Sequence, residues 1–135
     1  MKKHLLYLAA IFHIVAVLPV QAEERVKHYA YDIPESTNRA IQLYYENLGI
    51  IRHTLDSGAL NDQKLELIHE RSYALETATD YLRFTHKDHA AALKTLSQQV
   101  HEVHEASEEH DGKNFRPAFA ALNKADDILD TLPRQ

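Results

Sequence analysis

Apolar residues recur at steps of three and four along four segments of this 135-residue chain, and this periodicity limits the fold more than any other feature. In residues 35–56 the steps join Ile41, Tyr44, Leu48, Ile51 and Leu55. Similar stripes run through residues 62–84, 89–107 and 115–132. This spacing puts apolar side chains on one face of a helix. The sequence therefore predicts four amphipathic helices, with a buried core that includes Leu48, Leu75, Val100 and Leu122.

The breaks between the four segments are short and contain residues that end helices. Ser57 and Gly58 follow the first segment, and Gly112 and Pro117 bracket the last break, with Pro117 expected in a first helical turn. Short connections make consecutive helices antiparallel. We therefore predict an all-α, antiparallel up-down-up-down four-helix bundle over residues 35–135. A helical hairpin that dimerises fits the same pattern, so a monomer and a homodimer are both open.

Residues 1–22 have the pattern of a cleaved secretory signal peptide. Lys2 and Lys3 precede an apolar run over residues 5–20, and small residues follow it. The run has about 16 residues, fewer than the roughly 20 that a membrane-spanning helix needs. We expect an extended leader over residues 23–34, export to the periplasm and no stable membrane insertion after cleavage.

Charge and composition exclude several functional classes. The net charge is −5 at pH 7, which disfavours a nucleic-acid partner because phosphate binding needs a basic surface. The chain has no cysteine, so it has no disulfide and lacks the Cys-x-x-Cys-His stretch that usually attaches haem covalently. It also lacks a nucleophile elbow, a phosphate-binding glycine loop and a His-Glu-x-x-His stretch. These absences predict a protein that is not an enzyme.

Histidine is the one residue type in excess. Eight of the ten histidines follow the signal segment: His28, His53, His69, His86, His89, His101, His104 and His110. In an antiparallel bundle His69 lies level with His101 and His104, and His110 lies toward the end of the same helix pair. Imidazole groups bind copper, zinc or nickel, and Glu105 or Glu108 is placed to add an oxygen ligand. The candidate metal ligands are therefore His69, His101, His104 and His110.

The angular positions of these histidines favour a second interpretation. At about 100° per residue, His104 lies roughly 60° from the centre of its apolar stripe and His101 roughly 120° from it. We expect His104 at the rim of the bundle and His101 in solvent. The favoured function is then a non-enzymatic binding or interaction protein with a protein partner and no cofactor. The alternative is a transition-metal carrier, with haem a less favoured ligand.

Three segments carry a resemblance to a known family: "ERVKHY" at residues 24–29, "IHERSYALETATDYL" at 68–82 and "LSQQVHEVHEASEEHD" at 96–111. They resemble a family of small exported proteobacterial helical proteins classed as a domain of unknown function, which implies no established activity. In size, export and topology the chain is also distantly similar to the periplasmic b-type cytochrome bundle. That family needs a methionine and a histidine as haem ligands. Here the only methionine is Met1, so the ligand pair cannot be carried over.

Overall fold

The computed structural model describes residues 29–134, and within them every regular element is helical. Four α-helices and two short 3₁₀ segments follow in the order α1 (Thr37–Asp56), α2 (Asp62–Thr85), η1 (Lys87–His89), α3 (Ala90–Glu108), α4 (Gly112–Ala125) and η2 (Asp126–Thr131). The prediction of four helices is confirmed for this range. The predicted signal peptide and residues 23–28 of the predicted leader lie outside it.

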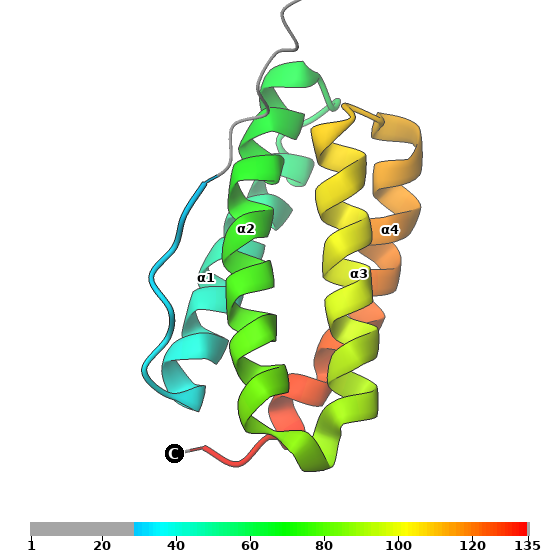
Figure 1. The fold of residues 1–135 in the computed structure, drawn as a ribbon. Helices are drawn as coiled ribbons and strands as arrows, with labels where there is room; N and C mark the ends of the chain where they lie inside the picture. The colour runs from blue at the N-terminus through cyan, green and yellow to red at the C-terminus, as the bar shows by residue number, and fades with distance from the viewer. Residues whose placement is uncertain (1–28, 135) are drawn as a thin grey trace, which may run out of the picture.

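Consecutive helices lie side by side (Figure 1), so that α2 packs on both α1 and α3, and α3 also packs on α4. The extended segment before α1, blue in Figure 1, runs along the outside of the helices. Leu48, Leu75, Val100 and Leu122 are fully buried, as the stripes predict. The four apolar faces therefore meet in one shared core. The candidate site lies where α2 and α3 pack against each other.

Polar side chains immediately before three of the α-helices cap the N-terminal ends of those helices. Ser36 accepts a hydrogen bond from the backbone N–H of Arg39 at the start of α1, and Asn61 accepts one from Lys64 at the start of α2. Asp111 accepts two from the start of α4. Each cap satisfies N–H groups that have no partner within the helix. These short polar residues explain why the helices begin where they do.

The fourth helix differs from the prediction at both ends. It begins at Gly112, because Asp111 caps it there, so Pro117 is the sixth helical residue and lies in the second turn. The expectation of a first-turn proline was wrong. Beyond Ala125 the backbone tightens into the 3₁₀ segment η2, which still buries Leu129. The stripe residues Leu129 and Leu132 remain buried although the backbone changes.

None of the helices in the described part of the chain is long and apolar enough to span a membrane.

Candidate metal centre

Two buried histidines face each other between α2 and α3. His69 on α2 and His104 on α3 are 2% and 6% exposed, and their ring centroids lie 5.0 Å apart in an edge-to-face arrangement. Glu108 lies one turn after His104 and is half-buried. One ligand atom from each of the three residues lies within 4.8 Å of the others. This group of two imidazoles and one carboxylate is the candidate metal centre.

Carboxylates also lie close to ring nitrogens of both histidines. His104 Nδ1 lies 3.1 Å from Glu76 Oε2, and His104 Nε2 lies 3.4 Å from Glu108 Oε2. His69 Nδ1 lies 3.7 Å from Glu66 Oε2. Neither ring nitrogen of His69 has a hydrogen-bond partner among the described residues. A carboxylate beside Nδ1 orients a ring and leaves Nε2 for a metal, which is how histidine ligands are commonly held.

The two imidazoles have different protonation preferences. Burial, together with the positive charge of His104, holds the pKa of His69 below its usual value. Burial also lowers the pKa of His104, but the contact with Glu76 outweighs burial and the net pKa of His104 is raised. Burial raises the pKa of Glu76, yet the same contact leaves that pKa below its usual value. Without an ion, a proton at the centre therefore favours His104, between two carboxylates, over His69.

Two tyrosines border the centre. The ring centroid of Tyr73 lies 4.4 Å from that of His104 and 5.3 Å from that of His69. Tyr29, in the segment before α1, has its ring centroid 6.2 Å from that of His69 and donates a 3.0 Å hydrogen bond to Glu66 Oε1. These rings help to exclude water from the imidazoles, which strengthens electrostatic interactions between them and the nearby carboxylates.

The structure brings two of the four predicted ligands together and places the other two on the flanks. The His101 side chain is 62% exposed and contacts Glu76 at 3.4 Å and Glu105 at 3.2 Å. The His110 side chain is 38% exposed and lies 3.7 Å from Asp62. Both side chains are too exposed to belong to the buried group. Of the two oxygen donors considered from the sequence, Glu108 is the one that joins His69 and His104.

The expected rim position of His104 was wrong, because its side chain is buried. The expected position came from the angle between His104 and the apolar stripe, which considers α3 as an isolated helix. In the structure α2 covers the flank of α3 on which His104 lies, and Tyr73 and Glu76 of α2 contact the imidazole. Neither residue was predicted to touch His104 from the sequence. Only the arrangement of the two helices shows that they do.

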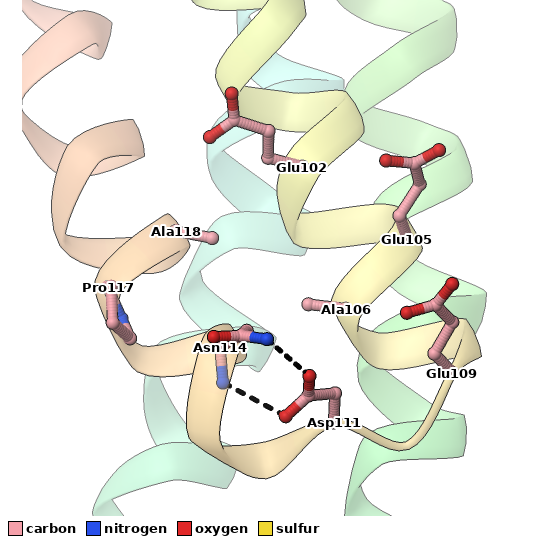
Figure 2. A pocket seen from close by; sticks show the side chains of 8 residues that line it. All are labelled: Glu102, Glu105, Ala106, Glu109, Asp111, Asn114, Pro117 and Ala118. Atoms are coloured by element: carbon pink, nitrogen blue, oxygen red, sulfur yellow. Dashed lines mark hydrogen bonds between the residues drawn. The ribbon is translucent and has the colours of Figure 1, made fainter.

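A shallow acidic groove lies on the other side of α3, between α3 and α4 (Figure 2). Its carboxylates come from Glu102, Glu105, Glu109 and Asp111. Figure 2 shows the Asp111 side chain hydrogen-bonded to Asn114, in the cap of α4. No histidine lines the groove, so among the described residues the imidazole pair makes the α2–α3 site the stronger candidate for a transition metal.

Comparison with known proteins identifies a family and no relative of known function. A search of curated proteins and a search of solved structures gave no match. The model of a family of unknown function, DUF6746, matches residues 1–129. That match covers nearly the whole sequence, and the chain belongs to the family of unknown function DUF6746.

Proposed function

We propose that this protein is an exported, periplasmic carrier that binds one divalent transition metal ion, copper, zinc or nickel, between α2 and α3. The ligands are His69, His104 and Glu108, and the protein is not an enzyme. The observation that carries the proposal is the pair of buried imidazoles from two helices, with a carboxylate ligand atom within 4.8 Å. Buried polar groups without hydrogen bonds are costly, and a bound ion would give His69 the partner that it lacks.

The donor set suits a carrier better than a structural metal site. Nitrogen and carboxylate donors bind borderline divalent ions. Structural zinc sites usually have four protein ligands, whereas three ligands leave a coordination position for water or for a donor from another molecule. Metal binding would compete with protonation of both imidazoles, because only a neutral imidazole is a ligand. The open position favours exchange of the ion.

The geometry argues against haem. An axial histidine pair must hold the porphyrin between its two rings. The rings of His69 and His104 are in edge-to-face contact with centroids 5.0 Å apart, and this leaves no space for a macrocycle between them.

A basic start, an apolar run and small residues support a cleaved signal peptide over residues 1–22. Short connections between the helices support an up-down-up-down order for the bundle. Of the two functions expected from the sequence, the favoured interaction protein and the alternative metal carrier, the buried imidazole pair supports the carrier.

The test is a calorimetric titration of Cu²⁺, Zn²⁺ and Ni²⁺ into the processed chain, purified from cells that express the full sequence. We expect one ion per chain for at least one metal. The double variant His69→Ala, His104→Ala should bind that metal at least about 100-fold more weakly, since two of three protein ligands are lost. A matched control, His53→Ala with His89→Ala, removes two histidines outside the site and should bind like the wild type.

Circular dichroism of each variant checks that the helices are intact. Equal, weak binding by the wild type and the His69→Ala, His104→Ala variant would refute the metal centre.

A further inference from the structure

The turn between α2 and α3 carries an exposed aromatic ring among cations. Phe84, in the last turn of α2, is 76% exposed and is the one aromatic among the exposed large apolar side chains of the described range. Lys87 Nζ lies 5.0 Å from the centroid of its ring. Arg83, Lys87 and Lys94 line the same surface depression as Phe84, with Asp80 as its one carboxylate. This group, the basic end, combines an apolar ring with a surplus of positive charge.

The acidic groove between α3 and α4 has the complementary properties. Four carboxylates line it, those of Glu102, Glu105, Glu109 and Asp111, and no lysine or arginine is among the lining residues. Figure 2 shows Ala106 and Ala118 pointing toward one another across the groove, so apolar methyl groups lie between the charges. An aromatic ring flanked by cations matches this groove in both charge and polarity.

The basic end and the acidic groove lie at opposite ends of one face of α3. Lys94 and Glu105 are both exposed and are eleven positions apart on that helix. Eleven residues make three turns and about 20°, so the two side chains project from the same face, about 17 Å apart along the axis. Gln98 and His101, also exposed, lie between them. One continuous face of the helix is therefore positive at one end and negative at the other.

The stability of α3 does not explain the acidic end of this face. Cations are favoured in the last turn of a helix, because the C-terminus carries a partial negative charge. The last turn of α3 contains no basic residue; Glu105 lies in it and Glu109 follows as the C-cap. Positive charge supplied by another molecule would offset this arrangement. The end of α3 thus independently favours a cationic partner at the groove.

We propose that two copies of this chain pair antiparallel along α3, with the basic end of each copy on the acidic groove of the other. A two-fold axis perpendicular to α3, midway between Lys94 and Glu105, places Lys94 of each copy at Glu105 of the second copy. It also brings each Phe84 to the apolar part of the opposite groove. Such pairing uses both surfaces at once and stops at a dimer. The inference goes beyond the proposed function, since the dimer does not depend on a metal ion.

Sedimentation velocity tests the pairing. The processed chain, purified from cells that express the full sequence, is measured over a wide range of concentrations with a chelator present. We expect a reversible equilibrium between monomer and dimer, with no larger species. High salt should weaken the dimer, because salt screens exposed charge pairs.

Charge reversal at either end should disrupt the dimer. Lys94→Glu places two carboxylates together at both contacts, and Glu105→Lys places two amines together there. Each variant alone should raise the dissociation constant of the dimer at least about tenfold, because like charges in contact cost several kcal/mol.

An equal mixture of the two variants is the decisive sample. In an antiparallel pair of one Lys94→Glu chain and one Glu105→Lys chain, both contacts again join opposite charges. We expect the mixture to form heterodimers with a dissociation constant within about threefold of the wild-type value. A mixture that stays as dissociated as its two components would overturn the antiparallel arrangement.

Three more variants complete the test. Phe84→Ser removes the exposed ring and should weaken the dimer at least about tenfold, as expected for an aromatic anchor. Arg39→Glu and Glu46→Lys are matched controls, since they reverse exposed charges on α1 and should leave the dissociation constant within about twofold of the wild type. Melting followed by circular dichroism checks that every variant is folded. A wild-type chain that stays monomeric at all concentrations, or that forms species larger than a dimer, would refute the proposed pairing.

Discussion

Histidine shows how strongly the surroundings decide what a residue in this chain does. The side chain of His69 is 3% exposed and that of His101 is 62% exposed, although both carry the same group on neighbouring helices. Burial lowers the pKa of His69, whereas carboxylate contacts raise that of His104. One residue type therefore supplies a buried imidazole with a lowered pKa, a buried imidazole with a raised pKa and a solvated side chain on the α2–α3 pair.

Tyr44 gives a prediction at the scale of a single residue. Its hydroxyl is buried and has no hydrogen-bond partner among the described residues, and burial raises its pKa strongly. Tyr44→Phe removes this unpaired group, so we expect the free energy of unfolding at pH 7 to rise by about 1 kcal/mol. Tyr31→Phe is the contrast, since the Tyr31 hydroxyl donates to the carbonyl of Glu70 and its loss should not stabilise the protein.

The pH dependence of the same variant has a definite sign. Because the pKa of Tyr44 is raised in the folded protein, its contribution to stability is complete below the unfolded value near 10 and is lost as the pH rises above it. Phenylalanine cannot ionise. The advantage of Tyr44→Phe over the wild type should therefore grow between about pH 10 and 11 in urea denaturation. A constant difference across that range would contradict the assignment of Tyr44 as a buried hydroxyl without a hydrogen bond.

At the scale of elements, the site depends on the pairing of α2 with α3. His69, Glu66 and Glu76 come from α2, while His104 and Glu108 come from α3. Within α3 the His104–Glu108 step of four residues places an imidazole and a carboxylate on one face. Neither helix alone holds both imidazoles. The candidate centre therefore exists only when the two helices are packed together.

Pro117 gives a prediction for one helix. It lies inside α4, where it cannot donate the hydrogen bond that would join its nitrogen to the carbonyl of Lys113, and its ring crowds that carbonyl. Pro117→Ala restores the bond at an exposed position. We expect the free energy of unfolding to rise by about 1 to 3 kcal/mol. The upper end of this range is the full penalty of a proline in a helix interior. Thermal and urea denaturation measure it.

Pro133→Ala is the matched control for this change. Pro133 lies after η2 and is exposed, so no helical hydrogen bond is restored there. Its replacement should not stabilise the chain. A gain of equal size in both variants would show that α4 is not strained at Pro117.

At the scale of the whole molecule, the helices of the described range share one core and have no disulfide to support it. Stability must come from packing of the apolar faces. Leu75, fully buried on α2, lies in the helix that contacts both α1 and α3. The same packing holds α2 against α3 and therefore keeps the candidate ligands together.

Leu75→Ala tests this dependence. Loss of a fully buried leucine should lower the free energy of unfolding by about 2 to 5 kcal/mol, because transfer energy is lost and a cavity is left. Ile33→Ala, at a side chain that is 80% exposed, should change it by less than about 0.5 kcal/mol. Chemical denaturation followed by circular dichroism gives both values. An unchanged stability in Leu75→Ala would mean that the helices are not packed in this register.

The four helices and most of the core follow from the sequence alone. Steps of three and four are a local property of the chain, so they identify the helical faces on which Leu48 and Val100 are buried without any knowledge of the neighbours. Histidine spacing likewise pointed to His69 and His104. The burial of His104, its pairing with Glu108 and the position of His101 outside the centre depend instead on how the helices pack. The reason is physical: the flank of α3 that loses water is set by where α2 packs, and that contact joins residues far apart in the chain.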